Sequence, residues 1–397
     1  MQQECNKTAC AGREPPYRRD TIPMPAVHDG TPRNAIRLPR KRSLQLKPES
    51  DGRHRHPDPR LVTPDLRMHT IVLTNPGSLE LIETPAPGRP DPGEALVRVH
   101  RIGICGTDLH AFRGVQPFFN YPRILGHELG VEIVEIGENH PALAPGDRCT
   151  VEPYLNCGRC GACLSGRTNC CDELRVLGVH TDGGMRPLIK VPVTKLHSSA
   201  SLSLDQLALV EMLGIGAHAA ERADPQPGES VLVIGAGPIG LSVIQFCALA
   251  GANVTVVDIN PARLAFCRDH LGVPRCLPEP PVADPFTAVF DATGNPKSMV
   301  TAFDHVATGG RLIFVGLYLG RIDFDSAEFH RRELTLLATR NATPATFRRI
   351  IDLMEIGRID PMPWITYRMT LTAIPQEFPG LLRQPGVVKA MVDLDRE

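Results

Sequence analysis

The chain has 397 residues, of which 42% are hydrophobic and 22% are charged. That length suits two domains, or three at most, with well-packed cores. The 43 basic residues are balanced by 44 acidic ones, so no overall charge points to nucleic acid or to a membrane surface as a partner. No apolar run reaches the roughly 18 residues of a transmembrane helix, so no membrane-spanning segment is expected either.

The first segment, residues 1–67, differs from the rest of the chain. It has 14 basic against 8 acidic residues and 10 of the 38 prolines, without apolar periodicity. Such a segment cannot bury enough surface to offset the entropy of ordering, so we expect it to be disordered. Its acidic residues and prolines disfavour a targeting peptide, and a basic arm for nucleic acid stays an alternative. We favour an artefact of start-site assignment, because Met68 opens a strand-like segment at 68–73.

Short alternating segments dominate residues 68–215. Residues 95–102 and 131–136 alternate apolar and polar side chains, and turn signals such as Asp91-Pro-Gly and Pro145-Gly-Asp separate the segments. This pattern predicts an antiparallel, barrel-like β domain that carries the candidate metal-binding loops.

Four cysteines within this region have the spacing C-x2-C-x2-C-x7-C: Cys157, Cys160, Cys163 and Cys171. Four thiolates on one short loop can close a tetrahedral zinc site with no open position, which makes it a structural site. Cys170 adjoins the fourth ligand, and the spacing selects Cys171. Clustered cysteines without an apolar signal peptide favour metal thiolates in a reducing cytoplasm over disulfides.

From about residue 228 the pattern changes to apolar strands alternating with helices. A continuous apolar strand at 230–234 precedes apolar residues at helical spacing from Pro238 to Ala250, and Gly251 is a natural stop. Further apolar strands follow at 254–258, 288–291, 311–316 and 334–338, which indicates a parallel, doubly wound sheet. A helix is expected over about 344–356, and a last strand near 387–392 is expected to return to the first domain.

A glycine-rich turn joins the strand at 230–234 to its helix. Gly235 permits the tight turn, Gly237 lets a pyrophosphate approach the backbone, and Gly240 lets helix and strand pack closely. The helix N-terminus supplies N–H donors for phosphates. Asp258 ends the next strand, where a carboxylate can bind both ribose hydroxyls and repel a 2′-phosphate, so NAD is preferred over NADP. The alternative is a glycine-rich turn without a ligand. The predicted cofactor-binding residues are Gly235, Gly237, Pro238, Ile239, Gly240, Asp258 and Arg263.

A second candidate metal site consists of Cys105, His127 and Glu128, one thiolate, one imidazole and one carboxylate. Each could instead be structural, as a core cysteine or a solvated pair. Their flanking glycines allow the backbone to approach a ligand closely. Spacing alone leaves the catalytic metal and the structural interpretation equally open. The flanking glycines are Gly103, Gly106, Gly126 and Gly130.

In chain order, residues 103–110 (GICGTDLH), 126–130 (GHELG), the four-cysteine lobe and 235–240 (GAGPIG) closely resemble the zinc-containing medium-chain alcohol and polyol dehydrogenases. The resemblance covers about residues 68–397 and is strongest to the sorbitol and L-threonine 3-dehydrogenase branch. It implies a GroES-like catalytic domain at 68–215 and a Rossmann domain at 216–342, with the active site in the cleft between them. A linking helix and return strand would occupy 343–397.

The resemblance also assigns roles to residues. It implies that Cys105, His127 and Glu128 bind a catalytic zinc, and that Glu211 binds it directly or through its water. This branch usually has proline after that glutamate and this chain has Met212, which leaves the distance of Glu211 from the metal open. By the same resemblance, Asp108 orients the histidine, and Thr107 and His110 form a proton relay.

The implied reaction is oxidation of a secondary alcohol to a ketone. Zinc lowers the pKa of the bound alcohol, Thr107 passes the proton towards His110, and hydride moves to NAD⁺. Two zincs per chain and a homodimer or homotetramer are expected.

Four segments look most like bacterial sugar-acid dehydrogenases acting on L-galactonate or L-idonate: 178–184, 291–295, 328–333 and 339–343. His330, Arg331 and Arg340 could hold a substrate carboxylate or could be solvated or face the cofactor. Residues 116–122 line the pocket in one interpretation, and Phe118 and Phe119 are ordinary core aromatics in the other.

Several rivals stay open at this point. L-Threonine 3-dehydrogenases and sorbitol dehydrogenases share the scaffold and the metal set. A zinc-binding interaction module would not need the glycine turn or Asp258. A zinc-free quinone or enoyl reductase would not need Cys105, His127 or the four-cysteine lobe.

Overall fold

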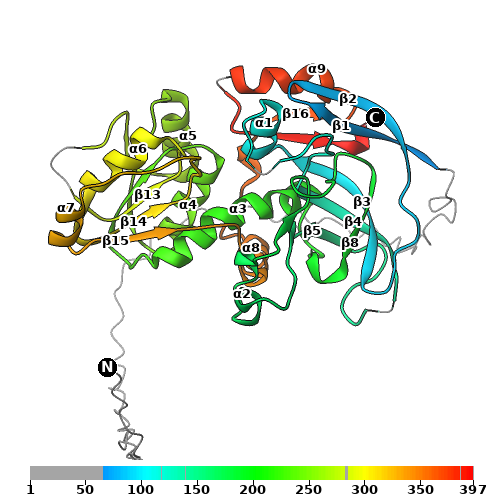
Figure 1. Ribbon diagram of the computed structural model, residues 1–397, viewed down its shortest axis with the longest axis horizontal. Helices are drawn as coiled ribbons and strands as arrows, with labels where there is room; N and C mark the ends of the chain where they lie inside the picture. The colour runs from blue at the N-terminus through cyan, green and yellow to red at the C-terminus, as the bar shows by residue number, and fades with distance from the viewer. Residues whose placement is uncertain (1–65, 118, 139, 282–284, 385, 397) are drawn as a thin grey trace, which may run out of the picture. The chain divides into compact units, whose positions relative to one another are not determined.

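The computed structural model describes residues 66–117, 119–138, 140–281, 285–384 and 386–396, which all belong to one compact unit (Figure 1). The predicted disordered segment, 1–67, lies outside the described residues except for its last two. Strand β1 begins at Arg67, next to the predicted start of the compact chain at Met68.

The first half of the structure is built on a seven-stranded sheet in the order β16-β17-β3-β4-β5-β9, with β8 also paired to β3. Pairs between its strands up to β9 are antiparallel, as predicted, whereas β16 and β17 run parallel to each other. Alternate residues such as Val131 and Ile133 point into one core. The bounds are β3 (Glu94–Gly103), β4 (Glu128–Ile136), β5 (Arg148–Val151), β8 (Leu188–Pro192), β9 (Leu196–Ser198), β16 (Ile365–Thr370) and β17 (Lys389–Asp393).

Smaller elements surround this sheet. Two antiparallel pairs, β1 with β2 and β6 with β7, form separate ribbons. One short helix follows Cys105, and another lies within the four-cysteine segment. The bounds are β1 (Arg67–Asn75), β2 (Ser78–Pro85), β6 (Tyr154–Leu155), β7 (Arg175–Val176), α1 (Gly106–Phe112), α2 (Gly161–Leu164) and α9 (Ile374–Glu377).

The second half is a six-stranded parallel sheet in the order β12-β11-β10-β13-β14-β15, which confirms the predicted parallel sheet. In β10, Val231 and Val233 face one core while Leu232 and Ile234 face another, so the sheet is buried on both sides. The bounds are β10 (Ser230–Ile234), α4 (Pro238–Leu249), β11 (Asn253–Val257), α5 (Pro261–Leu271), β12 (Arg275–Leu277), β13 (Phe286–Asp291), α6 (Pro296–Thr301), β14 (Val306–Phe314), α7 (Ser326–Arg331), β15 (Thr335–Ala338) and α8 (Pro344–Glu355).

A long helix that the sequence pattern did not predict, α3 (Leu204–Ala223), connects the two halves. Ser203 begins it with a capping box to Gln206. Helix α3 packs on β4, β5, α4 and α8 and is buried on nearly all sides, so it lacks the amphipathic period that reveals a surface helix. The predicted domain boundary between residues 215 and 216 falls inside this helix.

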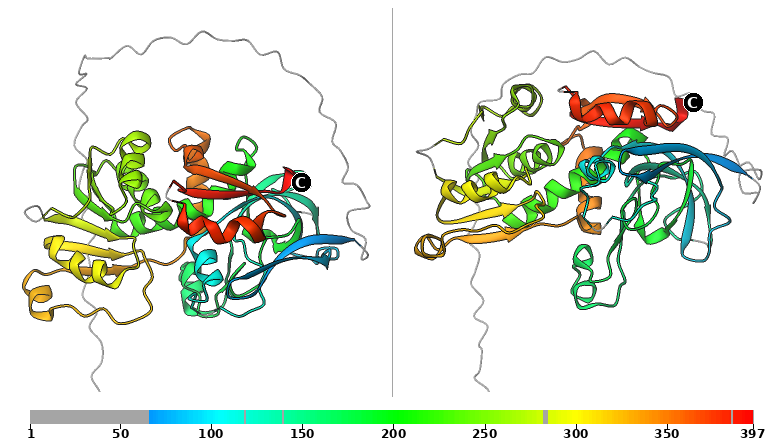
Figure 2. Two further views of the ribbon diagram at one scale, coloured as in Figure 1. Left: turned by 90° about the horizontal axis from the view of Figure 1, so that it is seen from above. Right: turned by 45° about the horizontal axis from the view of Figure 1, so that its top comes forward.

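The C-terminal segment returns to the first half, as predicted. Strand β17 pairs antiparallel with β3, with Met391 opposite Gly103, and the Ile104 amide donates to the carbonyl of Ala390 over 3.0 Å. Figure 2 shows this segment, in red, against the strands of the first half. The return strand therefore lies beside the chain that leads into Cys105.

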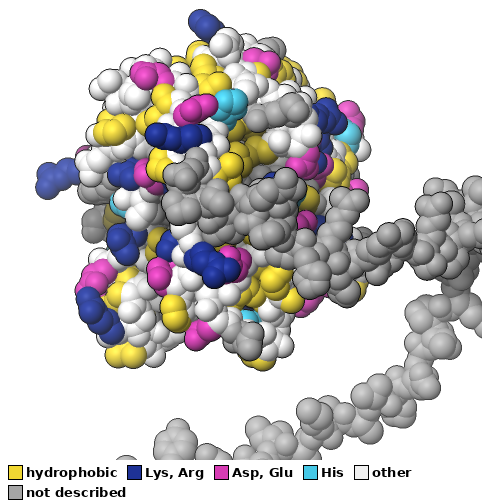
Figure 3. All heavy atoms as spheres, turned by 90° about the vertical axis from the view of Figure 1, so that its right-hand side faces the viewer, with side chains coloured by type: hydrophobic (Ala, Val, Ile, Leu, Met, Phe, Trp, Pro, Cys, Tyr) yellow, Lys and Arg dark blue, Asp and Glu magenta, His cyan; other side chains and the backbone are white. Residues whose placement is uncertain are grey.

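The surface carries charges of both signs. On the face shown in Figure 3, Lys and Arg side chains are interspersed with Asp and Glu side chains. Among the described helices, none combines the length and the apolar character needed to cross a membrane.

Candidate metal centres and cofactor site

The chain brings Cys105, His127 and Glu128 together at one end of the β3–β4 pair. Their ligand atoms all lie within 4.8 Å of one another. Cys105 follows β3 and begins α1, His127 immediately precedes β4, and Glu128 is the first residue of β4. The β3–β4 register places Gly103 opposite Glu128, and a Cβ on Gly103 would collide with the Glu128 carboxylate. The strand pairing thus converts two distant sequence segments into one donor set suited to zinc.

Asp108 supports the histidine of this group. Its Oδ1 lies 3.7 Å from His127 Nδ1, and its Oδ2 accepts the Cys105 amide at 2.9 Å. Burial opposes a charge on His127, but Asp108 and Cys105 together raise its pKa well above the ordinary value. A carboxylate behind a metal-binding imidazole fixes the tautomer and the ring orientation.

Several polar atoms of this site are buried without a partner. His127 Nδ1, Asp108 Oδ1 and Glu128 Oε1 lack a hydrogen bond within the described part of the chain. Unsatisfied buried polar atoms each cost about 1–3 kcal/mol, and a bound cation would offset that cost for the Glu128 carboxylate. The residues therefore fit a zinc ion.

Two further buried groups meet the site, and the sequence pattern did not predict either. Lys389, on β17, pairs with Glu128 Oε2 and donates to the Ile104 carbonyl over 2.9 Å. Tyr154 donates its hydroxyl proton to Glu211 Oε1. Lys389 could have been noticed in the sequence as a lone cation in the apolar run 387–392. Nothing in the sequence distinguishes Tyr154 as a site residue.

Glu211 comes from α3 and is only 4% exposed, but it does not belong to the group of three ligands within 4.8 Å. Burial raises the pKa of Glu211, and the charge of His127 opposes that rise. The carboxylate therefore lies near the site, held by Tyr154, and its direct binding to a metal stays a prediction.

The predicted relay residues lie on α1. Thr107 and His110 are three residues apart and so share one face of the helix. Neighbouring protein atoms and the charge of Arg113 lower the pKa of His110. The ring is therefore neutral near pH 7 and able to accept a proton.

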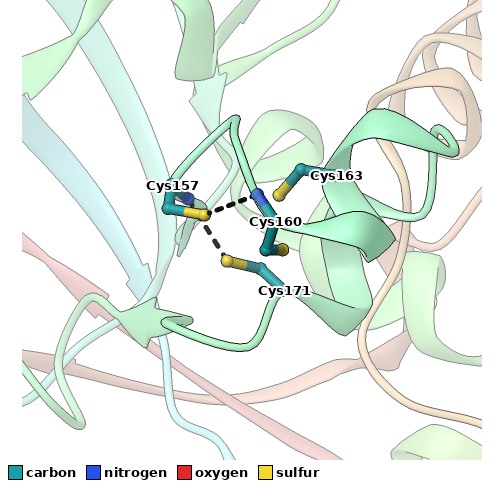
Figure 4. A group of neighbouring side chains, drawn as sticks. All are labelled: Cys157, Cys160, Cys163 and Cys171. Carbon is teal, nitrogen blue, oxygen red and sulfur yellow. Dashed lines mark hydrogen bonds between the residues drawn. The ribbon is translucent and has the colours of Figure 1, made fainter.

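The four lobe cysteines point towards one another, with their sulfur atoms within 4.8 Å (Figure 4). The Cys157 amide donates to Cys171 Sγ over 3.2 Å, and the Cys160 amide donates to Cys157 Sγ over 3.4 Å. Backbone hydrogen bonds lower the pKa of Cys157 to about 7, which favours the thiolate. Cys170 is not part of this group and instead accepts a contact from Arg167 Nη2 at 3.9 Å.

The glycine turn has the geometry that a dinucleotide requires. Gly235 has a φ of +98°, and a Cβ on Gly240 would collide with the carbonyl of Gly235. Gly237 begins α4 without a capping side chain, with Pro238 in the first turn, so the first N–H groups of the helix stay available for phosphate. Ile239 is half-buried on α4.

Asp258 lies directly behind this turn. Its Oδ2 accepts the Ala236 amide over 2.7 Å, and its Oδ1 accepts the Asn260 amide over 2.8 Å. Arg263 Nη1 is 3.7 Å from Asp258 Oδ2. The structure thus brings all seven predicted cofactor residues to the carboxyl ends of β10 and β11.

The basic residues suggested for a substrate carboxylate separate into two places. His330 and Arg331 lie on α7, where Arg331 makes two hydrogen bonds to Glu328. Arg340 follows the carboxyl end of β15. Burial and the charges of Arg340 and Arg123 lower the pKa of His180.

The 178–184 segment packs directly against the metal-ligand segment. A Cβ on Gly178 would lie 2.9 Å from the carbonyl oxygen of Gly126, the residue before His127. Phe119 packs on Tyr121 with ring centroids 4.9 Å apart and joins the core of the first half, which favours the core interpretation. Phe118 lies outside the described residues.

Comparisons with known proteins agree with this geometry. The family model "Alcohol dehydrogenase GroES-like domain" matches residues 91–201, and "Zinc-binding dehydrogenase" matches residues 238–355. The L-galactonate-5-dehydrogenase of Escherichia coli is 40% identical over 327 residues, which cover 78% of this chain and 94% of the relative. The L-threonine 3-dehydrogenase of Pyrococcus horikoshii is 31% identical over 76% of this chain and 91% of the relative.

Two solved structures are also similar. A crystal structure from Escherichia coli described as a short chain alcohol dehydrogenase, complexed with NADH, has a TM-score of 0.78 and 28% identity, covering 83% of this chain and 99% of its own. A putative zinc-binding dehydrogenase from Sinorhizobium meliloti, bound to NADP, has a TM-score of 0.75 and 27% identity, covering 83% of this chain and 100% of its own.

The chain therefore belongs to the zinc-type medium-chain alcohol dehydrogenases, with a GroES-like domain and a Rossmann-like parallel sheet. This confirms the family and the fold class that the sequence motifs indicated. It is an oxidoreductase acting on CH–OH groups with zinc and a nicotinamide cofactor.

Proposed function

We propose that this chain oxidises a secondary alcohol of a sugar acid or polyol to a ketone and transfers the hydride to NAD⁺. The observation that carries the proposal is the group of Cys105, His127 and Glu128, whose ligand atoms lie within 4.8 Å of one another. The relatives named for L-galactonate and L-idonate support the substrate class, with identities of 40% and 30%.

Zinc held by Cys105, His127 and Glu128, with Glu211 nearby, would lower the pKa of the substrate hydroxyl. Asp108 Oδ1 lies 3.7 Å from His127 Nδ1, on the side from which a carboxylate orients a metal-binding imidazole. Thr107 receives the hydroxyl proton, and the neutral ring of His110 accepts it at the helix surface. Cys157, Cys160, Cys163 and Cys171 hold a second, structural zinc.

Discrimination against NADP is assigned to Asp258. Its carboxylate accepts two backbone amides beside the glycine turn, so it is fixed where the adenosine ribose would bind. A 2′-phosphate there would meet a negative charge, and Arg263 at 3.7 Å offsets only part of it. Similar structures have been solved with NADH and with NADP, so the fold alone does not set the cofactor preference. The preference of this chain depends on its own residues, such as Asp258.

Arg340 is assigned to the substrate carboxylate. No carboxylate of the described residues forms an ion pair with it in the structure, and it follows the carboxyl end of β15, at the same edge of the parallel sheet as the glycine turn. Arg331, by contrast, is already paired with Glu328. A guanidinium free of acidic partners is suited to bidentate binding of a carboxylate.

The test follows NADH formation from NAD⁺ with L-galactonate, L-idonate, L-gulonate, sorbitol, xylitol and L-threonine, with and without a chelator. Chelator-sensitive activity on sugar acids supports the proposal. Activity on L-threonine alone would favour the alternative that the relative from Pyrococcus horikoshii suggests. Arg340→Leu should raise the KM for sugar acids selectively, and Arg331→Leu is the matched control.

A homodimer or homotetramer in the cytoplasm completes the proposal. None of the described cysteines is in a disulfide in the structure, which suits a reducing compartment. Light scattering of the purified protein measures the oligomeric state. The domain limits at residues 215 and 342 stay a prediction.

A further inference from the structure

Asn169 occupies an unusual place in the four-cysteine lobe. It belongs to a short 3₁₀ turn (Thr168–Cys170) just before the ligand Cys171, and it is 3% exposed. Its side-chain amide has two N–H bonds, and each has a partner outside the lobe. Nδ2 lies 2.8 Å from the carbonyl oxygen of Arg340 and 3.1 Å from Nε2 of His218.

The hydrogen bond to His218 ties Asn169 to the centre of the molecule. Because Asn169 Nδ2 can only donate, His218 Nε2 accepts, and the ring proton sits on Nδ1. That atom lies 3.6 Å from Glu221 Oε2. Glu221 accepts from Thr346 Oγ1 over 2.9 Å and from Arg349 Nη1 over 3.0 Å, so this chain of contacts runs from the lobe through α3 to α8.

The bond to Arg340 fixes the reversal between β15 and α8. Asn341 adopts a φ of +56°, and its Nδ2 donates to the Asn169 backbone carbonyl over 3.4 Å. Ala342 is fully buried against α3, where a Cβ on Gly214 would lie 3.0 Å from the Ala342 Cβ. Asn169 therefore binds the backbone carbonyl of Arg340, the residue whose guanidinium is proposed to bind the substrate carboxylate.

We infer that Asn169 is a positioning residue for substrate recognition: through its 2.8 Å hydrogen bond it fixes the backbone carbonyl of Arg340, and with it the point from which the Arg340 side chain extends. This inference rests on the proposed function, because it gives Arg340 the substrate carboxylate. It also assigns a role to the four-cysteine lobe beyond stability. The lobe contributes to selecting an acidic substrate although none of its cysteines touches substrate.

The test is a double-mutant cycle with Asn169→Leu, Arg340→Leu and the double variant. KM and kcat are measured for a sugar acid and for a neutral polyol, with zinc content, melting temperature and amide hydrogen exchange of 339–343. Asn169→Leu should raise the KM for the acid about tenfold, since it loses a buried hydrogen bond, and should leave the polyol KM within about twofold. In the Arg340→Leu background the same change should add nothing.

Controls separate positioning from general damage. Ser165 donates only to Ala162 within the lobe and is exposed, so Ser165→Ala should leave both substrates and the exchange of 339–343 unchanged. Asn169→Ser, which is smaller and polar, replaces Asn169→Leu if that variant does not fold. Exchange at 339–343 should rise in the Asn169 variants, with two zincs still bound.

The outcomes distinguish the inference from the proposed function. If Arg340→Leu leaves the preference for the acid unchanged, the proposed carboxylate contact is wrong. If Arg340→Leu removes that preference while Asn169→Leu weakens acid and polyol equally, or adds fully to Arg340→Leu, then the proposed function stands and the positioning role is overturned.

Discussion

The two cysteine-containing sites differ in how their ligands are brought together. The lobe takes all four cysteines from one short stretch, and its own backbone amides donate to the sulfurs at 3.2 and 3.4 Å. The group of Cys105, His127 and Glu128 depends on the pairing of β3 with β4, and its neighbours come from α3 and β17. One site is organised locally, whereas the other is assembled by the fold.

The two sites also differ in how deeply their side chains are buried. Three of the four lobe cysteines are partly exposed, as is Cys105, whereas the other groups of the assembled site, His127, Glu128 and Glu211, are at most 4% exposed. Buried polar atoms without partners make the assembled site dependent on a cation, because each costs free energy until it is satisfied. The lobe instead has backbone donors to its sulfurs from its own short stretch of chain. Changes at the two sites should therefore have different consequences.

The largest effect is expected from Cys105→Ser. The serine hydroxyl is a poor zinc ligand, and losing the Lewis acid removes several kcal/mol of transition-state stabilisation. We expect kcat/KM to fall by at least about a thousandfold, since each 1.4 kcal/mol is tenfold in rate. Metal analysis should show one zinc retained per chain. Full turnover by this variant would show that Cys105 is not a ligand of the catalytic metal.

Cys157→Ser changes the other of the two sites, the four-cysteine lobe. It should also leave one zinc per chain, but the lost metal is structural, so the melting temperature should fall by several degrees while activity on a neutral polyol at low temperature largely remains. Calorimetry measures the melting temperature of both serine variants, and metal analysis measures their zinc content. Equal losses of activity and stability in the two would contradict the distinction between a local and an assembled site.

Asp258→Asn tests the cofactor assignment with an isosteric, neutral side chain. The amide oxygen can still accept one backbone N–H, so the turn around Ala236 should persist. Losing the negative charge should lower the NAD/NADP ratio of kcat/KM about tenfold to a hundredfold, or about 1.4–2.8 kcal/mol. Steady-state kinetics with both cofactors measure it, and an unchanged ratio would discredit the role of Asp258.

The same contrast explains what the sequence could predict. The four cysteines and the glycine turn were predictable because spacing and positive φ are local properties, as with Gly235 at +98°. Cys105, His127 and Glu128 needed the family resemblance, since only the β3–β4 register brings them together. Lys389 and Tyr154 could not be predicted, because their contacts depend on β17 returning to β3 and on a buried helix, α3, whose pattern lacks an amphipathic period.

Tyr154→Phe should have the smallest effect on activity, and it tests the hydrogen bond from Tyr154 to Glu211 beside the catalytic group. Phenylalanine keeps the packing on Phe347, whose ring centroid is 6.1 Å away, and removes only the donor to Glu211. A lost hydrogen bond to a charged group is worth about 1.5–3 kcal/mol at most, and Glu211 can regain part of this by approaching the metal. We therefore expect kcat/KM to change by less than about tenfold, while the visible spectrum of the cobalt-substituted protein shifts.

Tyr367→Phe removes an equivalent bond, to Glu377 over 2.7 Å, and serves as the matched control. A cobalt spectrum that is identical in wild type and both variants would mean that Tyr154 does not set the position of Glu211, and that the carboxylate is held by α3 alone.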